Sequence, residues 1–225
     1  MKTLSIDTSA GSSVAVHDGE APIARGHSAD HRKHAESLAP LITEALASAG
    51  LALTHLDAVI VGIGPAPYTG LRSGIITAQM LARGANLPLY GVSPLAGIAR
   101  QILDRRPQAT VLVATDARRR EVYGATFRAL GDDDVELVDG PRVGSAATVA
   151  TDIPGGGCVV AGRGALLYAE HLPPTPDVDH DLDVATFHRI AAARLAAGRD
   201  DLLGTAPLYL RRPDVSLPQA AKRVS

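Results

Sequence analysis

The chain lacks disulfide partners and is poor in aromatic residues. Cys158 is the only cysteine among its 225 residues, and there is no tryptophan. No disulfide bond can form within the chain, which favours a reducing, cytoplasmic location, and the apolar run around Cys158 is typical of a buried, inert thiol. Aromatic residues make up only 3% of the chain against 46% hydrophobic residues, so Ala, Val, Leu and Ile have to build the core.

An excess of one charge sign and a long hydrophobic run are also missing. The 22 Lys and Arg residues nearly balance the 24 Asp and Glu residues, and the isoelectric point is about 6.4. A strongly basic nucleic-acid-binding domain is therefore excluded. No apolar run approaches the roughly 20 residues that span a bilayer, and residues 1–7 show no signal-peptide core, so we expect a cytoplasmic protein with no membrane contact.

The first half of the chain alternates between strand-like and helix-like patterns. Apolar residues recur every three or four positions from Leu38 to Ala49, which predicts an amphipathic helix with Pro40 in its first turn or at a kink. A second helix is expected over 71–85, and Ser93 followed by Pro94 opens a third that runs to about residue 104. Strands are expected over 3–6, 13–17, 23–27, 58–63 and 89–92.

The pattern restarts after a boundary at 105–107. In both halves a strand that ends in Asp (Asp7 or Asp116) is followed by a strand meander and then by helices. We interpret this as an internal duplication: an α/β fold with two similar lobes, 1–106 and 107–212, followed by a polar tail at 213–225 that we expect to be disordered. In the second lobe, strands are expected over 110–114, 121–127, 135–138 and 158–161, and helices from residue 145, over 165–171 and over 184–197.

The stretch 64–72 carries the clearest signal for function. It connects a strand to a helix, and a glycine-rich connection of this kind presents backbone N–H groups to an anion. Here Pro65 and Pro67 have no N–H group, and Ala66 stands where a glycine would let a phosphate approach. Thr69 is expected to cap the helix. We interpret this stretch, together with the turn at 7–9, as a vestigial phosphate-side loop. Its predicted members are Asp7, Thr8, Ser9, Gly64, Thr69 and Gly70.

Five segments resemble the TsaB family, also called YeaZ. They are Ile-Asp-Thr-Ser at 6–9, the run 34–42, the loop 64–72, the run 116–123, and Pro-Leu-Tyr-Leu-Arg at 207–211. Their order and spacing cover nearly the whole chain. The chain departs from the family at 66–68, where it has Ala-Pro-Tyr in place of Gly-Ser-Phe. The resemblance implies two lobes of the actin, sugar-kinase and Hsp70 type, each a mixed sheet with helices.

The resemblance also implies a role and partners. TsaB is a paralogue of TsaD, a catalytic subunit with a metal-binding His-x-x-x-His motif. It is a non-catalytic subunit of the complex that transfers a threonylcarbamoyl group to the adenosine 3′ of certain tRNA anticodons. The implied partners are a TsaD-like subunit, a TsaE-like ATPase, and tRNA through the complex only. The isolated chain would form a homodimer, and neither a cofactor nor a metal is implied for it.

The helix expected over 71–85 has apolar residues on two sides. One wide apolar side suits packing on a sheet, while Ile76 and Met80 project from another side. Apolar residues on two sides indicate burial on two sides, either under the rest of the chain or in a subunit interface. The resemblance favours the interface. The predicted interface residues are Leu38, Ile42, Arg72, Ile76, Gln79, Met80 and Arg83.

Plainer interpretations compete with a catalytic one. Asp7 could hold a metal near a phosphate, but we favour a role in closing the turn that follows its strand. Asp116, Arg118 and Glu121 could act as an acid–base set, but a salt-linked turn is favoured. His31 and His34 have helical spacing, yet a metal site needs three or four ligands, so an exposed pair is expected. The competing function is an ATP-dependent small-molecule kinase or transferase of the same superfamily.

Overall fold

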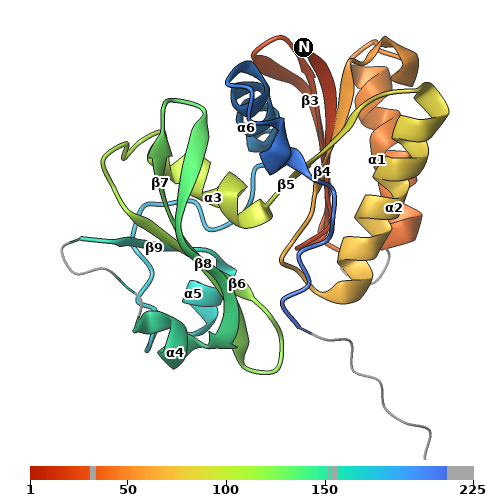
Figure 1. The fold of residues 1–225 in the computed structure, drawn as a ribbon. Helices are drawn as coiled ribbons and strands as arrows, with labels where there is room; N and C mark the ends of the chain where they lie inside the picture. Colours follow the sequence, from red (N-terminus) through yellow and green to blue (C-terminus); the bar gives the residue numbers. More distant parts are fainter. Residues whose placement is uncertain (31–33, 152, 154–156, 212–225) are drawn as a thin grey trace, which may run out of the picture.

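The computed structural model describes residues 1–30, 34–151, 153 and 157–211. Figure 1 shows two α/β halves, each built on one sheet, with helices on both faces of each sheet. No helix in these described ranges is long and apolar enough to cross a membrane. The predicted tail at 213–225 lies outside the described residues.

The first sheet has five strands in the order β3-β2-β1-β4-β5. Its first three strands form an antiparallel meander, and β4 and β5 then add in parallel. Two helices, α1 and α2, cover one face of the sheet, and the buried apolar residues between them and the strands form one core. The bounds are β1 Lys2–Asp7, β2 Ser12–Asp18, β3 Ala21–Ser28, α1 His34–Ser48, β4 Ala58–Gly62, α2 Tyr68–Ala85 and β5 Leu89–Val92, with a short 3-10 turn at Leu53–His55.

The second sheet repeats this arrangement with four strands in the order β8-β7-β6-β9. Three antiparallel strands again precede a parallel one, and the short helices α4 and α5 pack on one face. Up to the fourth strand and the helix after it, the order of elements is therefore the same in both halves, and only β5 has no counterpart among the described strands; this confirms the predicted two-lobed, actin-like α/β architecture. The bounds are β6 Val111–Asp116, β7 Glu121–Leu130, β8 Asp134–Ser145, α4 Ala146–Ala150, β9 Val159–Ala161 and α5 Arg163–Leu167.

Two helices lie between the sheets and join the halves. They are α3 (Pro94–Leu103), which follows the first sheet, and α6 (Thr186–Ala196), which comes late in the chain. One buried cluster contains residues of both sheets and both helices, among them Ile60, Phe127 and Phe187. The division of the chain at residue 106 stays a prediction, since α6 packs against the first sheet although it follows the second.

The end of the described chain also returns to the first sheet. After the 3-10 turn Asp200–Leu203, the N–H of Leu208 donates to the carbonyl of Ile63 at 2.8 Å. A Cβ atom added at Gly91 would lie 2.2 Å from the carbonyl oxygen of Gly204, so the returning segment runs directly against the glycine of β5. This contact places the segment 207–211 beside the loop that precedes α2.

Several predicted boundaries need correction. Helix α1 starts at His34 and not near residue 38, so Pro40 lies inside the helix and not in its first turn. Strand β8 runs over Asp134–Ser145, much longer than the predicted 135–138. It is an edge strand whose residues 136–140 are all exposed, and this exposure removes the apolar alternation that would have revealed it.

Candidate functional site

A cleft lies between the two halves, where the equivalent turns after β1 and β6 face each other. Its volume is about 500 Å³. The first half contributes Ser9 and the loop 65–67, the helix α3 contributes Ile98, and the second half contributes Arg118 and Leu167. The walls are thus mostly apolar, with charged groups at the second turn and at α5.

The turn after β1 is closed by its own side chains. Asp7 is 4% exposed, and its Oδ2 accepts hydrogen bonds from the Ser9 backbone N–H at 2.9 Å and from the Ser9 hydroxyl at 2.5 Å. Its other oxygen faces Gly62 of β4, where an added Cβ would lie 2.1 Å away. Burial raises the pKa of the Asp7 carboxyl above its ordinary value. The geometry therefore gives Asp7 the contacts of a turn-closing residue.

Thr8 fastens this turn to α2. Its hydroxyl donates to the carbonyl of Gly70 at 2.8 Å, and an added Cβ at Gly74 would lie 2.3 Å from the Thr8 hydroxyl oxygen. The small residues of α2 therefore allow the helix to approach the turn closely. Among the predicted members of the vestigial loop, Asp7, Thr8, Ser9 and Gly70 do come together.

The loop before α2 differs from the prediction at its helix start. Helix α2 begins at Tyr68, with Pro67 in the N-cap position and no side-chain cap, so Thr69 lies in the first turn and does not cap the helix. The prediction of an N-terminal cap at Thr69 is wrong. The helix starts earlier because the Pro67 carbonyl already accepts the Leu71 N–H at 3.2 Å, and the ring of Tyr68 packs against Tyr209 at a centroid distance of 5.0 Å. Gly64 has a φ of 90°, which only glycine adopts easily.

The turn after β6 is open and basic. Asp116 accepts a hydrogen bond from the Arg118 backbone N–H at 2.8 Å and forms an ion pair with the Arg118 guanidinium at 3.2 Å. Glu121 instead pairs with Arg211, whose Nη1 also donates to the carbonyl of Ala117 at 3.2 Å. The favoured interpretation of a salt-linked turn is confirmed, with Arg211 as a member that the sequence did not reveal.

The predicted interface residues divide into two groups. Leu38 and Ile42 are 0% and 5% exposed and belong to the core under the first sheet. The prediction that Leu38 and Ile42 lie in an interface is wrong, because their side of α1 packs inward on the strands and cannot contact a partner. On α2, by contrast, Ile76 is 56% exposed and Met80 is 66% exposed. No other part of the described chain covers them, and Arg72, Gln79 and Arg83 are exposed beside them.

Sequence reasoning missed two groups around these sites. Arg163 follows the glycine turn at Gly162 and lines the cleft, where it pairs with Asp181. A glycine-rich turn at the start of a helix could have drawn attention to it. Tyr209 lies beside the start of α2, and its hydroxyl accepts a hydrogen bond from Nε of Arg72 at 3.1 Å. Nothing local in the sequence indicates this contact between residues 137 positions apart.

The histidines do not form a metal site in the described part of the chain. Sequence reasoning overlooked that His27 and His31 have the His-x-x-x-His spacing. His27 lies in β3, near its end at Ser28, and its ring bonds the Ser13 hydroxyl at 2.9 Å. His31 and the side chain of His34 lie outside the described residues. The described residues contain no group of three or more His, Cys, Asp or Glu side chains able to hold a metal.

Comparisons with known proteins identify the family. The sequence profile of TsaD, described as tRNA N6-adenosine threonylcarbamoyltransferase, matches residues 28–169, more than half of the chain. Rv3421c of Mycobacterium tuberculosis is 40% identical over 188 residues, which cover 82% of this chain and 78% of Rv3421c. The solved structure of YeaZ from Pseudomonas aeruginosa is 28% identical, with a TM-score of 0.80 over 93% of this chain and 99% of that chain.

The TsaB protein of Escherichia coli, a tRNA threonylcarbamoyladenosine biosynthesis protein, is 40% identical over 97 residues. The match covers 43% of this chain and 42% of that protein. The chain belongs to the TsaB (YeaZ) family. This confirms the resemblance seen in the sequence. As a TsaB-family chain it shares the two-sheet fold of YeaZ, and its departures at 66–68 lie in the cleft wall and at the start of α2.

Proposed function

We propose that this TsaB-family chain is a non-catalytic subunit of the complex that transfers a threonylcarbamoyl group to the adenosine 3′ of the anticodon in tRNA. It supports a TsaD-type catalytic subunit, together with a TsaE-type ATPase. The observation that carries the proposal is the exposed apolar pair Ile76 and Met80, flanked by polar residues on a helix whose other face is fully packed. Adjoining exposed apolar side chains rimmed by polar residues support a protein contact at this face.

The chemistry of the cleft supports a non-catalytic role. Pro65 and Pro67 offer no N–H donors to a phosphate, and the Asp7 carboxyl is buried, with one oxygen bonded within its own turn and the other facing Gly62. A phosphoryl-transfer site would need oriented donors and an accessible carboxylate for a metal ion. The catalytic groups would therefore come from the TsaD-type subunit.

Substitution of Ile76 tests the docking face. Ile76→Asp should leave folding intact, because the side chain is exposed in the single chain. In an interface the new carboxylate would be buried without a partner, a cost of roughly 3–5 kcal/mol, which weakens association at least about a hundredfold. Leu130→Asp, at an exposed leucine 41% accessible on β7, is the matched control. Sedimentation with the TsaD-type subunit, and of the chain alone for its homodimer, measures the effect. Wild-type association of Ile76→Asp would exclude this face.

The cellular role has its own test. A strain without this protein should lose threonylcarbamoyladenosine from its tRNA while still making the adenylate precursor. Nucleoside mass spectrometry measures the modification. A normal level in a deletion strain without a second copy of the gene would contradict the proposed function.

A kinase is the second candidate, because a cleft of about 500 Å³ remains between the halves. Calorimetry of the chain alone with ATP separates the two functions. We expect weak ATP binding or none, since the 64–67 loop has few donors to offer. A low-micromolar affinity would favour the kinase.

A further inference from the structure

The turn between β6 and β7 consists of three consecutive arginines in an unusual backbone conformation. Arg118, Arg119 and Arg120 have φ angles of 62°, 55° and 62°, and all three are exposed. Glycine or asparagine adopts this left-handed region far more readily than arginine does. The turn geometry alone therefore does not account for the choice of residue. Strained residues of this kind concentrate at functional sites.

The described chain end connects this turn to the start of α2. Arg211 holds the turn through the Ala117 carbonyl and Glu121. Two residues earlier, Tyr209 packs against Tyr68, and the Arg72 guanidinium lies 3.9 Å from the centre of the Tyr68 ring. The result is one continuous surface, the arginine–tyrosine strip, made up of Tyr68, Arg72, Arg118, Arg119, Arg120, Tyr209 and Arg211.

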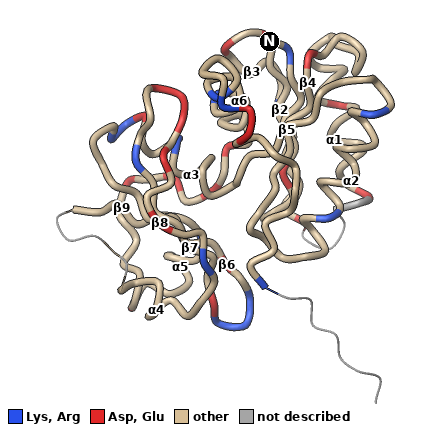
Figure 2. Tube along the Cα trace, in the orientation of Figure 1, with Lys and Arg blue, Asp and Glu red and all other residues tan. Residues whose placement is uncertain are grey.

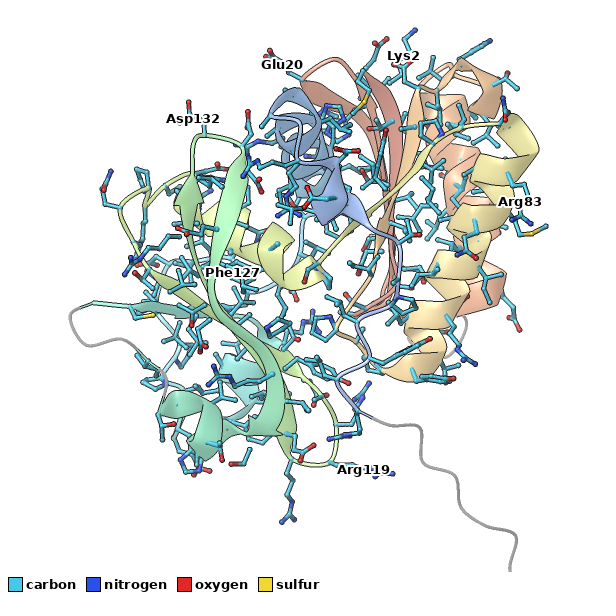
Figure 3. All side chains as sticks on the ribbon, in the orientation of Figure 1. Lys2, Glu20, Arg83, Arg119, Phe127 and Asp132 are labelled. Carbon is cyan, nitrogen blue, oxygen red and sulfur yellow. The ribbon has the colours of Figure 1, made fainter. Side chains whose placement is uncertain are left out.

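The strip lies at one edge of the molecule and faces solvent. Figure 2 shows its basic turn at the lower edge, next to the end of the described chain. In Figure 3 the side chain of Arg119 points away from the body of the protein. Tyr209 is 41% exposed. The two acidic residues of this turn pair with members of the strip, Asp116 with Arg118 and Glu121 with Arg211, so two of the five arginine charges are balanced and a net positive charge remains.

We propose that the arginine–tyrosine strip binds single-stranded RNA, namely the unpaired loop of the substrate tRNA, within the complex. The inference rests on the proposed function, which places the modified adenosine in such a loop. Guanidinium groups bind phosphates in a bidentate manner, and exposed aromatic rings beside them stack bases. This pairing of rings and guanidiniums favours RNA over an acidic peptide, which would need the charges alone.

The overall charge explains why the strip works only inside the complex. The whole chain carries a net charge of −2, and Asp116 and Glu121 offset two of the five arginine charges of the strip, so the strip alone gives weak binding at physiological salt. The catalytic subunit would supply the remaining phosphate contacts, and the strip would help to position the loop.

A matched pair of double variants tests the strip. Arg119→Asn/Arg120→Asn removes two charges, while asparagine tolerates the left-handed backbone and preserves the turn. Arg105→Asn/Arg106→Asn removes two charges from an exposed pair elsewhere. Binding of unmodified tRNA to the complex of the full chain and its TsaD-type subunit is measured from about 50 to 200 mM salt.

The strip variant should lower the slope of log affinity against log salt by about 1.4, the value for two lost single-strand phosphate contacts. Its affinity should fall at least roughly tenfold, and its melting temperature should hold. Tyr209→Ala should lower affinity about five- to hundredfold through lost stacking, with the slope unchanged. Tyr209→Phe should retain binding, because the ring remains.

Two results would overturn the inference while the proposed function stands. One is a complex that modifies tRNA and binds it with the same slope for both double variants. The other is loss of the TsaD-type subunit from the strip variant, which would make the strip a protein-docking surface. If wild-type protein forms no complex, the proposed function fails. In that case, tRNA is titrated into the full chain alone at about 20 mM salt, and the affinities of the two double variants are compared. Weaker binding of the Arg119→Asn/Arg120→Asn variant alone would support the strip, and equal binding would exclude it.

Discussion

The two halves of this chain repeat one order of elements but build it to different lengths. The helices on the outer face have 15 and 18 residues in the first half, whereas their counterparts α4 and α5 have five each. The first half therefore keeps an outward side of α2, with Ile76 and Met80, that no other part of the described chain covers. In the second half the short α5 leaves Leu167 60% exposed at the cleft.

The equivalent turns after β1 and β6 also differ: the first is buried and the second is exposed. After β1, Asp7 and Thr8 are buried and bond their own turn and α2. After β6, Asp116 is more exposed and three arginines extend into solvent. The turn after the first strand is thus buried in the first half and exposed in the second. The reason is that the long helix α2 packs against the turn after β1, whereas no long helix of the described chain packs against the turn after β6.

The largest effect should come from equivalent helices. Leu71→Asp places a carboxylate in the core under the first sheet, where Leu71 is 1% exposed, and should lower the free energy of unfolding by about 4–5 kcal/mol. Leu167→Asp, on the helix that follows β9, should change it by less than about 0.5 kcal/mol. Urea denaturation followed by circular dichroism compares the two. Equal losses would contradict this contrast between the two halves.

A smaller effect is expected where α6 meets the second sheet. Asp134 of β8 is 1% exposed and pairs with Arg194 at 3.0 Å and Arg199 at 3.1 Å. Asp134→Asn leaves both arginines without their charge partner and should cost about 2–3 kcal/mol, since the arginines retain some contact with water. Asp133→Asn, at a neighbouring exposed ion pair with Arg189, should cost less than about 1 kcal/mol. Similar melting temperatures for the two variants would show that the buried pair adds nothing.

The first sheet should show a pH dependence from its contact with α6. His17 of β2 and His188 of α6 stack at a centroid distance of 4.2 Å, and His188 bonds the Thr3 hydroxyl at 2.8 Å. Burial lowers the pKa of His17 to about 3 and also lowers the pKa of His188. Below about pH 6.5 the unfolded chain binds protons that the folded chain does not.

The histidine contribution to the free energy of unfolding should therefore be constant above about pH 7, and the free energy of unfolding should fall by a few kcal/mol between pH 6.5 and pH 3. Denaturant titrations at several pH values measure this loss. His17→Phe, which cannot be protonated, should flatten the profile. An unchanged slope in that variant would assign the acid sensitivity to other groups.

The smallest changes in stability are expected for substitutions of Asp7 and Asp116, the aspartates of the two equivalent turns. The pKa of Asp7 is raised by burial, so its ionised form is disfavoured at neutral pH and the cost is relieved as pH falls. Asp7→Asn should be neutral or up to about 1 kcal/mol stabilising at pH 7. Asp116→Asn loses an ion pair with the exposed Arg118 and should cost less than about 0.5 kcal/mol. A large loss for Asp7→Asn would instead give its negative charge a structural role.

Local patterns predicted the parts of the fold in which burial has a clear period. The buried positions of α2 include Leu71, Ile75 and Ala78, as its apolar spacing indicates, and α6 lies within two residues of its predicted bounds. The edge strand β8 was mispredicted because an exposed edge has no apolar alternation. The start of α2 was mispredicted because its first hydrogen bond runs from the Leu71 N–H to the Pro67 carbonyl, before Thr69. The order of the five motifs was sufficient to identify the family. The repeated turn after a strand that ends in Asp was sufficient to predict two similar lobes.

The sequence by itself determined the family, the duplicated α/β architecture and the apolar side chains Ile76 and Met80 on α2. Tertiary structure alone decided that Leu38 and Ile42 are core residues and that Arg211 and Tyr209 join the two turns into one surface. The physical reason is range. Periodicity reports how a segment meets its immediate layer, whereas contacts such as Arg72 with Tyr209 exist only after the chain returns across more than a hundred residues.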